Sequence, residues 1–244
     1  MSIGTLQVIG LGPGDPELIT LKAARLLAAA TVIAYFAKRG RRGHARSIAD
    51  ALIPPNAEQI RLEYPFTTEV AVTDRRYITG MAEFYADCAE RIARRLDSGR
   101  DVGLLCEGDP FFYGSSVALL DRLGRTYQSV VIPGVTGMSG CWTRAGIPMT
   151  QGDDVMTIVP GTLDAASLDA RLAGSDAVVI MKVGRNLPKI RAALRRAGRA
   201  DIAVYVERGT MSDERIWPLT DTERLHDRAP YFAMVLVPGR RQRR

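Results

Sequence analysis

Apolar and polar residues follow one another along the first half of this chain with two different periods, one typical of strands and the other of helices. A nearly unbroken apolar run at 102–106 predicts a strand in the buried centre of a parallel sheet. Between 74 and 96 the apolar residues recur at steps of three and four, which predicts a long helix with one apolar face, ending before Gly99. The same criteria predict further strands at 6–10, 31–35, 59–64 and 129–132 and further helices at 18–30, 47–52 and 115–123.

At 146–154 the sequence GIPMTQGDD interrupts this pattern with glycine, proline and polar residues, and we place a domain boundary there, between residues 149 and 150. The strands predicted beyond it are 155–159, 177–181 and 202–206, separated by helices at 164–173 and 187–197. The last two strands, 216–219 and 231–237, follow one another without a helix of normal length, which predicts a mixed, partly antiparallel sheet. We therefore expect two α/β domains, 1–149 with a mainly parallel sheet and 150–238 with a mixed sheet, and a basic tail at 239–244.

The composition is that of an ordinary globular protein, since 46% of the 244 residues are hydrophobic and 25% are charged. The longest apolar run, 26–37, falls well short of the ~20 residues that span a membrane, and the first residues have no signal-peptide pattern, so we expect neither a membrane segment nor secretion. With 3 cysteines and no Cys-x-x-Cys pair, the chain is expected to keep reduced thiols in a cytoplasm. With only 2 histidines, the chain has few residues for a histidine-based metal site or a Ser-His-Asp triad, and we predict no metal.

The formal net charge of +6 is unevenly distributed. Four arginines lie at 240–244, and because short like-charged ends are often only solvated, we predict no nucleic-acid partner. A second basic cluster directly follows the strand predicted at 31–35, and its members are Lys38, Arg39, Arg41, Arg42, His44 and Arg46. Cations next to a strand end can receive an anionic ligand, but a solvated loop explains the charge alone equally well.

A glycine-rich segment, GLGPGDP at 10–16, lies between the first predicted strand and helix. Its third glycine comes one residue too early for a dinucleotide-binding turn, and no acidic residue lies between 17 and 50 to bind a ribose. Pro13 also removes a backbone N–H that a phosphate would need. The segment is therefore predicted to be a rigid, sharply bent turn that lets the backbone approach a ligand closely.

Two more glycine-containing segments follow predicted strands, EGDPFFYG at 107–114 and IPGVTGMSG at 132–140. Because ligands of open α/β sheets bind at the carboxyl ends of strands, both segments are candidates for a binding site. Two alternatives remain open: the aromatic residues of the first segment could be tucked into the core, and Thr136 and Ser139 of the second could be helix caps only. Weaker segments of the same kind end the strands at 180–184 and 207–210.

Taken in order, these segments resemble one family, the tetrapyrrole methylases, which are class III S-adenosylmethionine-dependent methyltransferases. The resemblance rests on GLGPGDPELITLKA, EGDPFFYG, IPGVTGMSG, the strand that ends at Met181 and the ERGT segment, and it covers the chain up to the basic tail. It implies a homodimer of two α/β domains with the cofactor in the cleft between them. Within the family, EGDPFFYGS and the stretch from IPGVTGMSGCW to VPGT look most like those of enzymes that methylate C20 of precorrin-2, giving precorrin-3A in cobalamin biosynthesis.

By motif position, the resemblance implies that cofactor contacts come from Pro13, Glu107, Gly108, Asp109, Phe112, Thr136, Gly137, Met181 and Gly209. The tetrapyrrole would meet Gly12, Gly14 and Asp15. Because precorrin-2 carries eight carboxylates on a flat macrocycle, we also expect guanidinium groups of the basic cluster, from Arg39, Arg41 and Arg42, to bind the substrate. Asp109 could either hold the cofactor or only fix its own turn.

Methyl transfer from a sulfonium mainly requires alignment, and the reduced macrocycle is nucleophilic without help. The hydrogen on C20 must then leave as a proton. No catalytic residue is assigned, and the polar residues to test as proton acceptors are Asp15, Glu63 and Tyr64. The alternatives are the cobalt complex of precorrin-2 as substrate, another tetrapyrrole methylase such as a uroporphyrinogen-III C-methyltransferase, a methylase of macromolecules, and a non-catalytic tetrapyrrole-binding protein.

Overall fold

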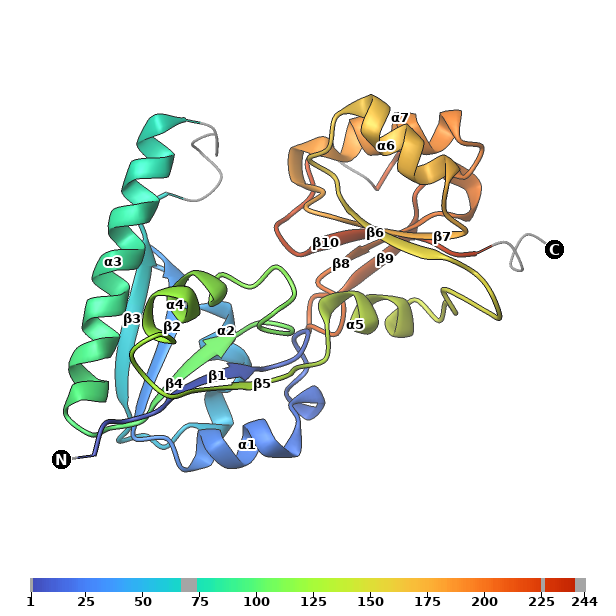
Figure 1. Cartoon of the computed structure of the whole chain (residues 1–244). Helices are drawn as coiled ribbons and strands as arrows, with labels where there is room; N and C mark the ends of the chain where they lie inside the picture. Colours follow the sequence, from blue (N-terminus) through green and yellow to red (C-terminus); the bar gives the residue numbers. More distant parts are fainter. Residues whose placement is uncertain (1, 67–73, 225–226, 240–244) are drawn as a thin grey trace. The chain divides into compact units, whose positions relative to one another are not determined.

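A computed structural model, which describes residues 2–66, 74–224 and 227–239, divides the chain into two compact units (Figure 1). They are Met1–Thr136 and Gly137–Arg244, so the boundary lies earlier than the predicted one between residues 149 and 150. The reason is that the helix α5 (Gly137–Arg144) and the segment after it pack on the second sheet, where Cys141 and Met149 are buried with Val179 and Leu236. The predicted basic tail, apart from Gly239, lies outside the described residues.

The first unit is built on a sheet of five parallel strands in the order β3-β2-β4-β1-β5. The strands are β1 (Leu6–Gly10), β2 (Val32–Lys38), β3 (Glu58–Tyr64), β4 (Val102–Cys106) and β5 (Ser129–Ile132). β4 is buried along its whole length, as its apolar run predicted. Because all five strands run the same way, the segments after Gly10, Cys106 and Ile132 leave the sheet at one edge.

Helices cover both faces of this sheet (Figure 1). α3 (Arg75–Asp97) and α4 (Val117–Leu123) pack on one face, and α1 (Leu21–Ala28) and α2 (His44–Ile48) pack on the other, together with the 3-10 helix η2 (Asp50–Leu52). Another 3-10 helix, η1 (Pro16–Leu18), precedes α1. The long predicted helix is confirmed as α3, which begins where Asp74 accepts a hydrogen bond from the backbone N–H of Arg76 at 2.8 Å. The helix predicted at 47–52 is instead α2 followed by η2, and it starts earlier than expected.

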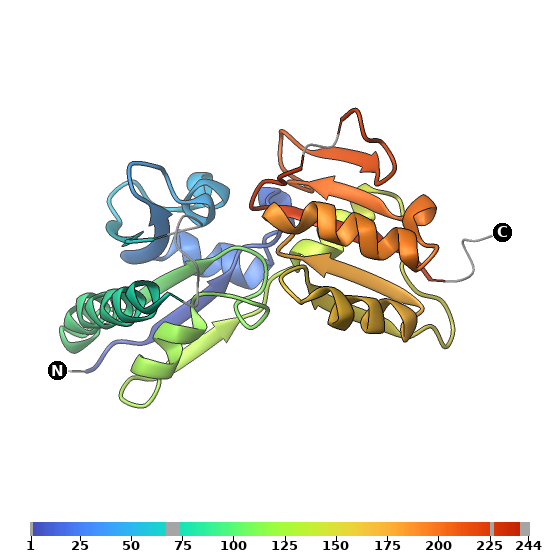
Figure 2. The same ribbon diagram turned by 90° about the horizontal axis from the view of Figure 1, so that it is seen from above.

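The second unit contains a mixed sheet in the order β6-β7-β10-β8-β9, which confirms the predicted sheet type. Its strands are β6 (Met156–Pro160), β7 (Ala177–Met181), β8 (Val204–Glu207), β9 (Arg215–Pro218) and β10 (Ala233–Val237). β10 runs antiparallel to both β7 and β8, so the carboxyl ends of those two strands lie at the same edge of the sheet. One face carries α6 (Ala165–Ala173) and α7 (Leu187–Arg196), which lie side by side in Figure 2, and the other carries α5. Two 3-10 helices, η3 (Gly184–Asn186) and η4 (Ala200–Ile202), flank α7.

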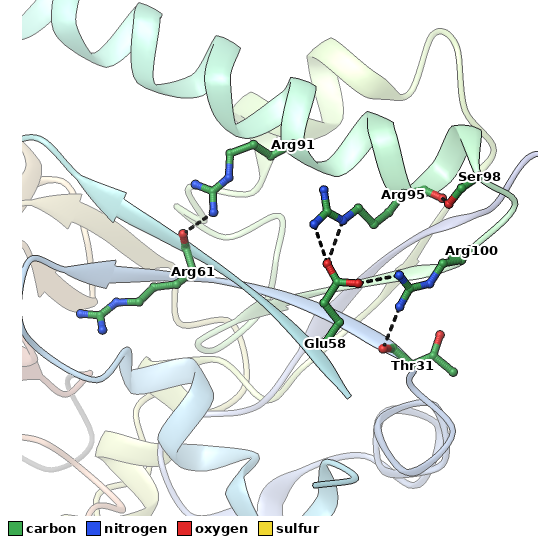
Figure 3. Close-up of polar contacts among 7 residues, drawn as sticks. All are labelled: Thr31, Glu58, Arg61, Arg91, Arg95, Ser98 and Arg100. Carbon is green, nitrogen blue, oxygen red and sulfur yellow. Dashed lines mark hydrogen bonds and ion pairs between the residues drawn. The ribbon is translucent and has the colours of Figure 1, made fainter. Parts of the chain in front are cut away.

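Two polar networks hold helices and strands together, away from the carboxyl edges of the two sheets. In the first unit, Glu58 at the start of β3 binds Arg95 of α3 at 2.6 Å and Arg100, just before β4, at 2.5 Å (Figure 3). In the second unit, the guanidinium of Arg199 is 3% exposed and donates to the carbonyl oxygens of Leu172, Ser175, Asp176 and Pro238. Because both networks join segments that are distant in sequence, we assign them a structural role.

Among residues 2–66, 74–224 and 227–239, no helix is both long enough and apolar enough to cross a membrane.

Candidate functional site

Three glycine-rich turns meet at the carboxyl edge of the first sheet. A Cβ atom added to Gly134, after β5, would lie 2.1 Å from the carbonyl oxygen of Gly108, after β4. A Cβ added to Gly10, at the end of β1, would lie 2.6 Å from the backbone nitrogen of Gly134. The turns after β1 and β4 are also bonded directly, since the N–H of Gly108 donates to the carbonyl of Gly12 at 2.8 Å. The predicted close approach of backbone at this edge is therefore present, and it involves the backbones of all three turns.

Asp109 fastens two of these turns. Its Oδ1 accepts a hydrogen bond from the backbone N–H of Phe111 at 2.9 Å, and its Oδ2 accepts one from the N–H of Gly134 at 3.1 Å. The first bond closes an Asx turn within its own segment, and the second crosses to the turn after β5. The carboxylate of Asp109 thus fixes these turns, and its contact with the cofactor stays a prediction.

The aromatic residues beyond Asp109 divide into two kinds. Phe111 and Tyr113 are exposed, at 64% and 52%, so the alternative of aromatics tucked into the core is wrong for these two. Phe112 is half-buried and packs edge-on against Tyr113, with ring centroids 5.1 Å apart. Tyr113 has φ of 57°, a conformation that is unfavourable for residues other than glycine. An exposed apolar wall on strained backbone is typical of a binding site.

The second unit has its own concentration of strained backbone at the carboxyl ends of β7 and β8. Lys182, directly after Met181, has φ of 52°, while Arg208 and Thr210, on either side of Gly209, have φ of 48° and 73°. With Tyr113, these are all of the positive-φ residues other than glycine that the structure records among its described positions. Because such conformations persist only where the surroundings enforce them, they mark both strand ends as functional candidates.

Sequence analysis alone did not reveal this strain, since only the glycines signal positive φ in a sequence. Of the predicted cofactor residues in this unit, Met181 ends β7, and Gly209 packs on α5, where an added Cβ would lie 2.8 Å from the Cys141 sulfur. Gly137 begins α5 directly after Thr136, close to Met234 of β10.

Glu107 occupies a position that the motif did not predict. Its Oε1 accepts a hydrogen bond from the backbone N–H of Ala45 at 3.1 Å, in the first turn of α2. Burial raises the pKa of this carboxyl group, while the bond from Ala45 and the charge of His44 oppose the rise. A partly buried carboxylate thus connects the turn after β4 to the basic segment after β2.

The basic segment itself is held at several points. Arg61 of β3 donates to the carbonyl of Arg41 at 2.7 Å and to that of Lys38 at 3.2 Å. Arg42 forms an ion pair with Asp50, which also binds Arg46 at 2.7 Å. The side chains of Arg39 and Arg41 are exposed and form no ion pair with another described residue. The loop therefore presents two guanidinium groups to solvent and holds the third, that of Arg42, in an ion pair.

The three residues proposed as proton acceptors are already engaged. Asp15 accepts from the N–H of Glu17 at 2.9 Å and caps η1, and Glu63 lies 2.9 Å from Arg61. Tyr64 stacks on Phe36, with ring centroids 5.2 Å apart. None of them is distinguished as a base by these contacts.

The structure thus gathers Pro13, Glu107, Gly108, Asp109 and the turn that leads to Thr136 at one edge of the first sheet, next to Gly12, Gly14 and Asp15. It places Met181 and Gly209 at the corresponding edge of the second sheet. Close backbone approach and apolar walls fit a ligand that is bound through backbone groups, such as an adenosyl cofactor. That residues from both units hold one cofactor molecule stays a prediction.

Comparison with known proteins identifies the family. The model of the tetrapyrrole (corrin/porphyrin) methylases matches residues 5–223. The chain is 51% identical over 243 residues to a precorrin-2 C(20)-methyltransferase of a Sinorhizobium species, covering 100% of this chain and 98% of that protein. It is 26% identical to a cobalt-precorrin-2 C(20)-methyltransferase of Salmonella typhimurium, covering 96% of each. A crystal structure of uroporphyrin-III C-methyl transferase from Thermus thermophilus complexed with S-adenyl homocysteine has a TM-score of 0.66, with 26% identity over 96% of this chain and 92% of that one.

Proposed function

Because the chain belongs to the tetrapyrrole (corrin/porphyrin) methylases, we propose that it methylates C20 of precorrin-2 to give precorrin-3A in cobalamin biosynthesis. The chain is an S-adenosylmethionine-dependent methyltransferase. The observation that carries the choice of substrate is the 51% identity to the Sinorhizobium enzyme, which extends over the whole chain and therefore includes every segment of the candidate site.

The cofactor is proposed to contact Pro13, Glu107, Gly108, Asp109, Phe112, Thr136, Gly137, Met181 and Gly209. S-adenosylmethionine supplies an activated methyl group when bound, and S-adenosylhomocysteine is the product. The protein's part is to hold donor and acceptor in line, to exclude water and to give the C20 proton a path away. The converging turns of the first unit support this assignment, because they leave backbone groups and the exposed Phe111 and Tyr113 around one edge.

The tetrapyrrole is proposed to lie along Gly12, Gly14 and Asp15, with its carboxylates bound by the basic loop. Arg39 and Arg41 are exposed and have no ion pair with any other residue that the structure describes, so they are the stronger candidates. Arg42 would have to exchange its ion pair with Asp50 for one with the substrate. Guanidinium groups suit this task because their planar donors match a carboxylate in two places.

A cobalt complex of precorrin-2 is the second candidate substrate, since the similar Salmonella protein bears that name. We further propose a homodimer that works in the cytoplasm with reduced thiols. The three cysteines are free and buried, and desolvation raises the pKa of each, Cys88, Cys106 and Cys141, to about 12. Sedimentation equilibrium with and without S-adenosylhomocysteine tests the dimer.

The decisive experiment is a single-turnover incubation with S-adenosylmethionine and anaerobically prepared precorrin-2, followed by mass spectrometry and carbon-labelled NMR. One methyl group added at C20 is the expected result, and repeating the reaction with the cobalt complex assigns the metal state of the substrate. Methylation at another carbon would overturn the proposed position. Binding of S-adenosylhomocysteine without any transfer would overturn the substrate and move the search to other tetrapyrroles.

A further inference from the structure

The start of α2 has no cap of its own. Gly43 is the N-cap residue and, having no side chain, forms no capping hydrogen bond. A residue with a capping side chain cannot replace it, because a Cβ at Gly43 would lie 2.3 Å from the carbonyl oxygen of Phe36 and 2.9 Å from the Tyr35 ring. The local sequence therefore leaves the first N–H groups of the helix without the usual partner.

Glu107, in the turn after β4, supplies the missing acceptor. Its Oε1 lies 3.1 Å from the backbone nitrogen of Ala45, the second helical residue, where an N-cap side chain would normally bind. β2 leads into α2 and pairs with β4, so a side chain directly after β4 is within reach of that helix start. A carboxylate at this position also interacts favourably with the positive end of the helix.

This cap fixes one end of the basic loop. Arg61, from β3, fastens the carbonyls of Lys38 and Arg41 at the other end. The exposed residues Arg39 and Arg41 lie in the stretch that Arg61 holds, and the bond from Ala45 to Glu107 holds the chain shortly after it. Substrate binding then has to immobilise few additional rotatable bonds of the loop, which lowers the entropic cost of binding.

We propose that Glu107 is a positioning residue, which caps α2 in place of Gly43 and thereby holds the carboxylate-binding loop next to the turn after β4. The inference rests on the proposed function for the identity of the substrate, but not for the cap.

Three substitutions separate this role from others. Glu107→Gln keeps an acceptor for the Ala45 N–H and loses the charge. Glu107→Asp keeps the charge but shortens the side chain by one methylene group, which moves the carboxylate away from Ala45. Glu107→Ala removes both the hydrogen-bond acceptor and the charge. Loss of the cap in the Asp and Ala variants is expected to raise the KM for the tetrapyrrole about tenfold. The Gln variant is expected to recover most of the affinity.

A second readout does not need turnover. Hydrogen exchange of the Ala45 amide is expected to accelerate about tenfold in the Asp and Ala variants and to return toward the wild-type rate in the Gln variant. Asp164→Ala is the matched control, since Asp164 caps α6 in the second unit by accepting from the Ser167 N–H at 2.8 Å. It should lower thermal stability without changing the KM for the tetrapyrrole or the exchange of Ala45.

Two outcomes would overturn the inference. Equal loss of kcat in all three Glu107 variants, with an unchanged KM for the tetrapyrrole, would make the carboxylate a proton acceptor and not a positioning residue. Unchanged exchange at Ala45 would remove the cap itself. Wild-type protein that transfers no methyl group would refute the proposed substrate, whereas the exchange measurement would still decide the cap.

Discussion

The carboxylate of Asp109 reaches from the turn after β4 to the turn after β5, where it accepts a hydrogen bond from the backbone N–H of Gly134 at 3.1 Å. Its other oxygen holds the N–H of Phe111 at 2.9 Å. One side chain thus fixes the relative position of two turns that are separate in sequence and that follow the strands on either side of β1. This arrangement makes the geometry of the candidate cofactor site dependent on a residue that acts within the protein.

Replacing Asp109 tests that dependence. Asp109→Ala should lose about 2 kcal/mol of stability, because two backbone N–H groups lose a charged acceptor. Asp109→Asn offers only one acceptor oxygen, so its stability should lie between those of the wild type and Asp109→Ala. Urea unfolding gives the stability, and calorimetric titration gives the Kd of S-adenosylhomocysteine, which should weaken in the same order. An alanine variant with wild-type stability would contradict the structural role.

Gly134 tests the close approach itself. In Gly134→Ala the new methyl would lie 2.1 Å from the carbonyl oxygen of Gly108, so either the turn moves or the fold is strained. We expect a loss of about 3 kcal/mol and a weakened affinity for S-adenosylhomocysteine. Gly174→Ala is the control, because its Cβ would meet the Ala170 carbonyl oxygen at an ordinary 3.5 Å and should change neither property.

The basic loop offers a graded test of substrate binding. Arg39→Ala and Arg41→Ala should each raise the KM for the tetrapyrrole several-fold, because these exposed side chains are proposed to bind its carboxylates. Arg42→Ala should have a smaller effect, since the guanidinium is already paired with Asp50. The Kd of S-adenosylhomocysteine should not change in any of the three. An unaltered KM in the Arg39/Arg41 double variant would refute the loop as the carboxylate site.

The contribution of Glu58 to stability is expected to depend on pH. Hydrogen bonds from Arg95 and Arg100 lower the pKa of its carboxyl group (Figure 3). Its stabilisation is therefore present above the unfolded-state pKa and is lost as the pH falls through the lower, folded-state value. Glu58→Gln should lose about 1 kcal/mol at pH 7, since the pair is partly exposed, and the difference from wild type should shrink on acidification.

Urea unfolding between pH 7 and pH 3 measures this difference. The exposed pair of Glu90 with Arg94, at 3.7 Å, provides the comparison, and Glu90→Gln should be indistinguishable from wild type. A difference for Glu58→Gln that stays constant with pH would contradict the ionic origin.

Arg199 should be the most sensitive cation of the second unit. Arg199→Lys cannot reproduce the planar set of donors that binds four carbonyl groups, and we expect a loss of about 3 kcal/mol in urea unfolding. Arg196→Lys is the matched control, because Arg196 forms an exposed pair with Asp169 at 2.9 Å. Equal losses of stability in the two variants would show that the buried position of Arg199 contributes little to the free energy of unfolding.

The sequence by itself determined the elements and the order of the binding segments. The apolar runs at 102–106, 129–132 and 177–181 coincide with β4, β5 and β7, because buried strands and amphipathic helices have local periodic signatures. The short run of motifs was enough to indicate the family, since each motif is a local string.

Only the tertiary structure decided what depends on contacts between distant segments. It placed α5 with the second unit rather than the first, because the apolar residues of α5 and the segment after it are buried against β7 and β10, a pairing that no local pattern encodes. It moved the start of α2 from the predicted Ser47 to His44, where the N–H of Ala45 donates to Glu107 in the turn after β4. It paired Arg42 with Asp50 and left Arg39 and Arg41 exposed. Local periodicity follows from the geometry of a single element, whereas caps, ion pairs and unit boundaries are free-energy differences settled only when the elements pack.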